Sequence, residues 1–290
     1  MHRIRAAAAA LSLACVTALA APAAGALDVP IRTRAVPDGR AIVARNEYHA
    51  PLLVEIELTG VRRAADGTAP RAVVLIPPLT ELVVTTVQGA APGVTPAFGY
   101  RAAYSLGDPL ARHDDAVRYR LPFADGLRFF VSQAPGGRAQ THDTPDTADA
   151  IDFAMPPGMP VVAARGGIVM QVVQHYGVGR ADPAYIDRAN LVRILHDDGT
   201  WADYAHLQRA SVRVKPGQRV ATGDALALSG NSGYTFGPHL HFAVKRNRNG
   251  EIVSVPVRFR TDVAADFAAR EGSIAAAVYG ASAVARLRPE

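Results

Sequence analysis

A two-residue alternation of apolar and polar side chains is the feature that most restricts the fold of this chain. In the segment LLVEIELT, residues 52–59, Val54, Ile56 and Leu58 alternate with two glutamates and a threonine. Successive side chains of a β-strand point to opposite faces, so this pattern predicts a strand with one buried face. Short strands at this spacing predict an all-β module resembling a small sandwich over residues 27–112. The other strand patterns of this module, separated by Pro, Gly and Asp clusters, lie at residues 72–78, 81–87 and 100–106.

Denser strand patterns follow a junction at residues 111–126. In LVRILHDDGTWADYAHL, residues 191–207, the Asp198-Gly199 pair is a strong signal for a hairpin turn. Further strands, interrupted by Gly-Gly, Pro-Gly and Thr-Gly turns, are predicted within residues 161–177 and 212–230.

The 290 residues have room for two domains. We expect a mainly β fold, with a β-sandwich-like accessory module over residues 27–112 and a second β domain over residues 113–262. No helical period occurs before the Ala-rich segment of residues 263–290. That C-terminal tail is expected to hold one or two short surface helices.

Residues 1–26 have the pattern of a secretory signal peptide. A basic start, MHRIR, precedes an apolar run and the small residues AGA, which predicts cleavage near Ala26. The apolar run is shorter than the ~20 residues of a membrane-spanning helix, which disfavours a retained anchor. Acylation of Cys15 is disfavoured because the preceding residues, SLA, fit a lipobox poorly. We therefore expect an exported protein, periplasmic or secreted, with no stable membrane span.

The composition excludes several classes of protein. Hydrophobic residues make up 49% of the chain, which provides enough apolar mass for globular cores. Cys15 is the only cysteine, so the mature protein would have neither a disulfide nor a thiol nucleophile. The formal net charge is +5, and the basic residues, almost all arginine, are dispersed. Nucleic acid is therefore not an expected partner.

The segment GPHLHF places two histidines on one face of a predicted strand. His239 and His241 are two residues apart, whereas Leu240 and Phe242 point to the opposite face. Imidazoles bind metal ions and transfer protons near neutral pH. Alone, the pair is also compatible with a solvated strand face, so the interpretation depends on the rest of the chain.

Two further clusters carry side chains that can bind a metal. His142 precedes Asp152 in THDTPDTADAIDFAMP, and strand alternation places Ala150 and Ala154 on the same face as Asp152. These small neighbours leave the space that a ligand needs. His206 lies in the segment DYAHL. Two histidines and a carboxylate would leave one zinc position open to water, which is typical of catalytic zinc sites.

Three segments together resemble the signature blocks of the lysostaphin-type (LytM-like) zinc endopeptidases of cell-wall peptidoglycan. They are AIDFAMPPGMPVVAARGGIV, NLVRILHDDGTWADYAHL and GNSGYTFGPHLHF, and the resemblance covers roughly residues 118–262. It implies an antiparallel β-sheet groove with one zinc ion per chain on its floor and a metal-bound water as the nucleophile. It also implies that the metal ligands are His142, Asp152 and His241 and that the catalytic histidines are His206 and His239.

The sequence leaves two features of this site open. Because the chain has no HExxH glutamate, either His206 or His239 would transfer the proton, and both could donate to a developing oxyanion. The loop after His142 is acidic where the family often has glycine. Three carboxylates of that loop could compete for the metal: Asp143, Asp146 and Asp149.

The predicted function is hydrolysis of the peptide cross-links between peptidoglycan stems by a zinc endopeptidase. The alternative from another class is a non-catalytic wall-binding protein that activates a partner amidase. Degenerate relatives of that kind lose metal ligands, whereas this chain retains them. A metallopeptidase for proteins or secreted peptides is a third, weaker hypothesis. The module of residues 27–112 could be inhibitory or targeting.

Overall fold

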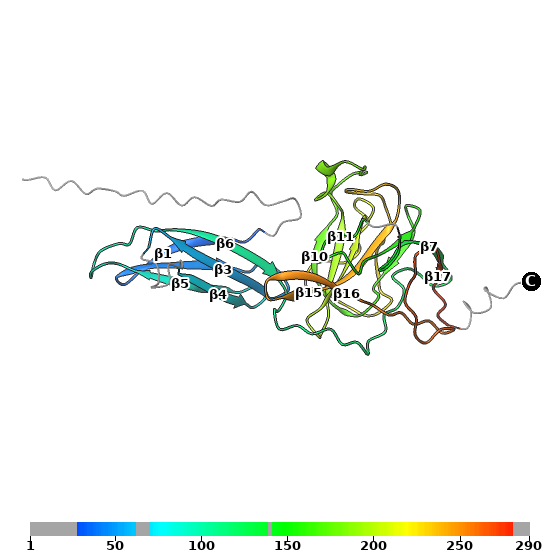
Figure 1. Cartoon of the computed structure of the whole chain (residues 1–290), viewed down its shortest axis with the longest axis horizontal. Helices are drawn as coiled ribbons and strands as arrows, with labels where there is room; N and C mark the ends of the chain where they lie inside the picture. The colour runs from blue at the N-terminus through cyan, green and yellow to red at the C-terminus, as the bar shows by residue number, and fades with distance from the viewer. Residues whose placement is uncertain (1–27, 62–69, 139–140, 281–290) are drawn as a thin grey trace, which may run out of the picture.

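The computed structural model of the chain describes residues 28–61, 70–138 and 141–280. Within them, all regular elements are strands except one 3-10 turn, η1 (Pro183–Tyr185), which confirms the prediction of a mainly β fold. Two β modules lie next to each other along the long axis (Figure 1). The predicted signal peptide, residues 1–26, lies outside the described residues. In the part of the chain that is described, no helix has the length and apolar character needed to cross a membrane.

The N-terminal module consists of two antiparallel three-stranded sheets. Their orders are β1-β2-β5 and β4-β3-β6. The sheets share a buried hydrophobic cluster that includes Ile42, Leu52 and Ile56, each 0% exposed. β3 is the strand predicted from alternation, and its burial changes at every residue as that pattern requires. The strands are β1 (Ile31–Val36), β2 (Gly39–Arg45), β3 (Leu52–Thr59), β4 (Arg71–Ile76), β5 (Glu81–Gln88) and β6 (Gly99–Leu106).

The second module is built on one large antiparallel sheet. Its order is β13-β10-β11-β12-β15-β8-β7-β17, with β16 paired to β15, and a small separate sheet joins β14 to β9. β11 and β12 form the predicted hairpin, with Gly199 in its turn at a φ of +81°. The strands are β7 (Arg128–Gln133), β8 (Ile151–Ala154), β9 (Pro160–Val162), β10 (Gly167–Val173), β11 (Leu191–Leu195), β12 (Trp201–Ala205), β13 (Arg219–Val220), β14 (Ala225–Leu228), β15 (Leu240–Arg248), β16 (Glu251–Val255) and β17 (Ile274–Ala276).

The large sheet has one apolar face and one face that carries polar side chains. Tyr204, Phe242 and Ile151, from three neighbouring strands, belong to the buried core of this module. The side chains of alternate residues point to the other face, where His241 lies directly opposite Asp152 in the ladder. One face of the sheet therefore packs against the hydrophobic core, and the candidate site lies on the opposite face.

The prediction of short surface helices in the Ala-rich tail is wrong for residues 263–280. No helix occurs there, and β17 instead pairs with β7 at the edge of the large sheet. Ala275 and Ala277 are buried in the core, at 4% and 1% exposure. The helix preference of alanine amounts to less than about 1 kcal/mol per residue, so burial and ladder hydrogen bonds outweigh it. Residues 281–290 lie outside the described residues.

The two modules share buried contacts. Trp201 of β12 and Met170 of β10 belong to the hydrophobic cluster of the N-terminal module. Asn247 of β15, 0% exposed, donates its amide hydrogens to Ser105 Oγ at 2.9 Å and to the Leu106 carbonyl at 3.0 Å. These contacts hold the β15–β16 hairpin against the N-terminal module, where the two modules meet in Figure 1.

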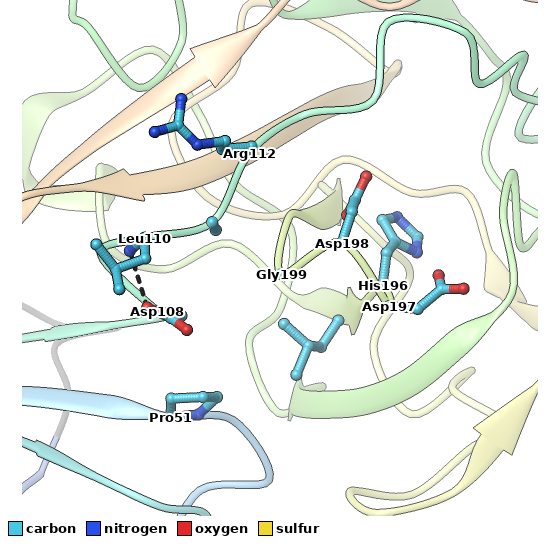
Figure 2. A pocket seen from close by; sticks show the side chains of 10 residues that line it. Pro51, Asp108, Leu110, Arg112, His196, Asp197, Asp198 and Gly199 are labelled. Atoms are coloured by element: carbon cyan, nitrogen blue, oxygen red, sulfur yellow. Dashed lines mark hydrogen bonds between the residues drawn. The ribbon is translucent and has the colours of Figure 1, made fainter.

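A pocket of about 430 Å³ lies between the segment that links the modules and the β11–β12 turn (Figure 2). Its acidic side chains already have partners. Asp108 accepts a hydrogen bond from the Leu110 backbone at 2.8 Å, and Asp198 pairs with Arg165 at 2.7 Å. None of the five predicted site residues lines this pocket. Its lining consists of Pro51, Asp108, Leu110, Ala111, Arg112, Leu195, His196, Asp197, Asp198 and Gly199.

Candidate metal centre

Neighbouring strands bring His241 and Asp152 together. The two residues are direct cross-strand partners in the β15–β8 ladder, so their side chains project from the same face. His241 Nδ1 lies 3.0 Å from Asp152 Oδ1. The alternation in GPHLHF therefore has the structural consequence that the sequence predicts.

His142 completes the cluster from the loop that precedes β8. Its Nε2 atom lies 3.3 Å from Asp152 Oδ2, and its ring centroid lies 4.9 Å from that of His241. One ligand atom from each of the three residues lies within 4.8 Å of the others. Side chains that are up to 99 positions apart in the sequence, His142 and His241, thus converge on one point.

The spacing and the donors of this cluster fit zinc. In tetrahedral sites zinc binds histidine nitrogen and carboxylate oxygen at ~2.0–2.2 Å, so neighbouring ligand atoms lie about 3.3 Å apart. The two contacts between the histidines and the carboxylate, 3.0 and 3.3 Å, match that separation. Three protein ligands also leave a fourth position for water or substrate, as in catalytic sites.

The carboxylates of the acidic loop lie outside this cluster. Asp146 accepts a hydrogen bond from Lys245 Nζ at 2.9 Å. Asp149 accepts one from Ser254 Oγ at 3.1 Å. The third, Asp143, is exposed. The histidine of this loop is therefore the side chain that faces the buried carboxylate of β8.

Asp152 lies in a buried environment rich in hydrogen-bond donors. Burial raises the pKa of its carboxyl, but hydrogen bonds from His142 and His241 outweigh burial and hold that pKa far below its usual range. Gln133 Nε2 also donates to Asp152 Oδ2 at 3.0 Å, while Gln133 Oε1 accepts from the backbone of Thr141 at 3.0 Å. Gln133 thus fixes the carboxylate and the residue before His142 together. Its place in the site could not be predicted from the sequence, because only a register shift in β7 places Gln133 opposite Asp152.

The two predicted catalytic histidines flank the cluster. The ring centroids of His206 and His239 lie 4.4 Å apart, and the ring of His206 lies 5.9 Å from that of His241. His239 Nε2 lies 3.7 Å from Asp152 Oδ2. All five residues singled out in the sequence therefore meet in one place.

Backbone carbonyls fix the orientation of both flanking rings. His206 Nδ1 lies 2.7 Å from the Ser232 carbonyl, and His239 Nδ1 lies 2.8 Å from the Gly237 carbonyl. Because a carbonyl can only accept, the proton of each neutral ring belongs on Nδ1. The Nε2 atoms therefore keep their lone pairs and are able to accept a proton.

His206 combines an uncommon backbone conformation with a low pKa. Its φ is +62°, in the left-handed region that residues other than glycine rarely adopt outside functional or strained sites. Burial, together with the neighbouring His239 and His241, lowers the pKa of His206 to about 3, so the ring is neutral at pH 7. Ser232, whose carbonyl holds this ring, is itself held because its Oγ accepts from the Asn190 backbone at 2.9 Å. No sequence pattern singles out Ser232.

Two other histidines of the second module, His175 and His196, lie apart from this site. His196 is 3% exposed, and its Nδ1 donates to the Gly166 carbonyl at 2.9 Å. Burial lowers the pKa of His196 to about 4. His175 is exposed and its ring lies against Tyr176, with centroids 4.0 Å apart.

Residues 146–253 match peptidase family M23. The chain carries an M23 peptidase domain. The matched segment contains Asp152, His206, His239 and His241, whereas His142 lies four residues before it. The first of the three converging side chains thus enters the site from just outside the matched segment of this M23 domain.

Known proteins resemble the M23 domain over part of their length. A segment of 91 residues, 31% of this chain, is 38% identical to 18% of the peptidoglycan DD-endopeptidase ShyA of Vibrio cholerae. A segment of 94 residues, 32% of this chain, is 34% identical to 23% of the glycyl-glycine endopeptidase ALE-1 of Staphylococcus capitis. The chain thus spans about a fifth of the length of these curated relatives. The crystal structure of a mutant catalytic domain of the M23 protein EnpA from Enterococcus faecalis shares 25% identity. It aligns over 51% of this chain and 95% of that one, with a TM-score of 0.34.

Proposed function

We propose that this protein is a zinc-dependent endopeptidase that hydrolyses the peptide cross-links of cell-wall peptidoglycan. The observation that carries the proposal is the convergence of His142, Asp152 and His241, flanked by His206 and His239, on one face of the sheet. The match of residues 146–253 to a peptidase family supports peptide hydrolysis. The name of the relative ShyA, a peptidoglycan DD-endopeptidase, supports peptidoglycan as the substrate class.

One zinc ion per chain would be held by His142 Nε2, Asp152 and His241 Nδ1. When bound, zinc would supply a polarising charge for the scissile carbonyl and lower the pKa of a bound water. The protein contributes an aligned ligand set, because Gln133 holds the carboxylate from behind. Partners of this kind, one shell beyond the metal, orient ligands and raise metal affinity.

Proton transfer is assigned to His206 and His239. Each ring has its Nδ1 engaged by a backbone carbonyl, so Nε2 is the atom that accepts a proton from the attacking water and returns it to the leaving amine. Once protonated, either ring can also donate a hydrogen bond to the developing oxyanion. Positioned general acid–base groups of this type contribute ~10²–10⁴-fold in rate.

Export after cleavage near Ala26 would bring the enzyme to its substrate in the periplasm or outside the cell. We assign residues 27–112 to an accessory module, and residues 113–262 to the catalytic domain. The strand β17, Ile274–Ala276, adds residues beyond 262 to the same sheet.

Mass analysis of muropeptides tests the proposed function. Purified peptidoglycan is incubated with the mature protein, with and without a zinc chelator. Cross-linked muropeptides should be converted to uncross-linked ones, each cleaved bond adding one water, and the chelator should stop this reversibly. A parallel incubation with casein tests general proteolysis. Binding to the wall without any cleavage would instead favour the non-catalytic activator of a partner amidase.

A further inference from the structure

The loop that carries His142, residues 141–150 and here called the ligand loop, is fastened to the sheet near each end. At its start, the backbone N and Oγ1 of Thr141 both lie 3.0 Å from Gln133 Oε1. Toward its end, Ser254 N donates to the Pro145 carbonyl at 2.8 Å, and the Asp149 backbone donates to Ser254 Oγ at 2.9 Å. The predicted metal ligand thus lies on a segment tied to β7 and β16.

The middle of the ligand loop is tied down by a charge pair. Lys245 Nζ lies 2.9 Å from Asp146 Oδ2 in the loop and 3.2 Å from Asp203 Oδ2 on β12. The Lys245 side chain is only 8% exposed, and the Asp203 side chain 5%. Asp203 has a second cation, Arg193, whose Nε lies 3.0 Å from Asp203 Oδ1.

The placement of Lys245 relates this charge pair to the metal centre. Lys245 follows His241 by four residues on β15, so the two side chains project from the same face of the sheet. The strand that carries one predicted ligand thus also carries the cation that contacts the loop of another. A shift of the ligand loop would move His142 away from His241.

Because Lys245 is buried, its ion pairs should contribute more to stability than an exposed ion pair does. Exposed salt bridges contribute ~0–1 kcal/mol, whereas removal of one partner of a buried pair is strongly destabilising. Asp203 is already neutralised by its ion pair with Arg193. The second cation is therefore not needed to neutralise Asp203, and its other partner is Asp146 of the ligand loop.

We propose that Lys245 is a positioning residue that holds the ligand loop, through Asp146, at the spacing that lets His142 and His241 bind one metal ion. This inference rests on the proposed function, because it takes His142 as a zinc ligand. Lys245 itself is not one of the three residues that converge on the proposed metal site.

Zinc affinity in the full-length protein tests the proposal. The apparent dissociation constant is measured by competition with a chromogenic chelator for Lys245→Met, for Asp146→Asn and for the double variant. Each single change should raise that constant about 10–100-fold, the range for partners one shell beyond a metal. The double variant should be no worse than either single one, because both remove the same contact. Lys245→Arg should return the constant to within about threefold of wild type.

Arg193→Met is the matched control. It removes the other cation beside Asp203, and the side-chain partners of Arg193 are Asp203 and Gln171, which both lie outside the ligand loop. It should lower the free energy of unfolding as Lys245→Met does, while leaving the zinc dissociation constant within about twofold of wild type. If Lys245→Met does not fold, Asp146→Asn replaces it, because that carboxylate is 40% exposed and its loss is milder.

Hydrogen exchange of the metal-free protein separates this inference from the proposed function. The amides of Ala148 and Ala150 donate to the carbonyls of Thr144 and Thr147 within the ligand loop. Disruption of the Lys245 contact should speed their exchange at least about tenfold relative to the Arg193→Met control. A wild type that binds no zinc would refute the proposed function and, with it, this role in metal binding. Equal effects of the lysine and arginine variants on zinc affinity, or unchanged exchange in the ligand loop, would refute the positioning role alone.

Discussion

Replacement of Tyr204 by phenylalanine should weaken the fold and leave the site intact. Tyr204 is 0% exposed on the core face of β12, and its hydroxyl oxygen accepts the backbone N–H of Ala164 at 2.7 Å. Removal of this hydroxyl leaves the buried N–H of Ala164 without an acceptor, which lowers the free energy of unfolding by about 1–3 kcal/mol. Burial raises the pKa of Tyr204 well above its usual value, so the hydroxyl stays protonated and takes no part in acid–base chemistry.

Urea unfolding of Tyr204→Phe measures this cost directly. The midpoint should fall by about 1 M at an unchanged slope, since the surface exposed on unfolding is the same. Tyr185→Phe is the control, because the Tyr185 hydroxyl accepts its hydrogen bond from Arg180 in solvent and its loss should cost less than ~0.5 kcal/mol. Zinc content and muropeptide release should match wild type in both variants. An unchanged urea midpoint for Tyr204→Phe would contradict the predicted loss of stability. A folded Tyr204→Phe protein that holds zinc but no longer releases muropeptides would contradict the prediction that the hydroxyl takes no part in catalysis.

Three further predictions concern the core, the module interface and pH. A chain ending at residue 262 should melt about 5–10 °C below one ending at residue 280, because it loses β17 and the buried Ala275. This corresponds to a loss of about 2–3 kcal/mol in the free energy of unfolding. Equal melting points would contradict this prediction. Asn247→Ala should cost about 2–4 kcal/mol in chemical unfolding, because it leaves buried acceptors of the N-terminal module without a donor. His196, with its pKa lowered to about 4, contributes stability that is present above pH 6.5 and lost as the pH falls toward 4, because the unfolded chain binds the proton first. Between those pH values the unfolding free energy of wild type should fall by roughly 3 kcal/mol more than that of His196→Asn, which keeps a donor but does not titrate.

Local pattern accounts for most of the strands. The alternation at residues 52–59 corresponds to β3, and the Asp-Gly turn corresponds to the β11–β12 hairpin. Both signals are local, because side-chain period and turn geometry depend on a few neighbouring residues. The tail could not be predicted in this way. Its alanines favour helix locally, whereas the partner that makes Ile274–Ala276 a strand, β7, is more than a hundred residues away.

The site shows the same division. The five residues that converge were predicted because histidine and aspartate are chemically distinctive and lie in recognisable segments. Gln133 and Ser232 were missed, because glutamine and serine occur throughout surfaces and only tertiary register brings them to the site. Lys245 was missed for the same reason, since its partner in the ligand loop is 99 positions away.

The central claim, that His241 binds metal while His239 moves protons, is tested most directly by zinc content and muropeptide release measured together on two variants. His241→Ala removes one of three protein ligands, so bound zinc and hydrolysis should both be lost. His239→Ala leaves the ligand set complete, so zinc should stay near one per chain while hydrolysis falls ~10²–10⁴-fold. Loss of zinc from His239→Ala with zinc retained by His241→Ala would contradict the account.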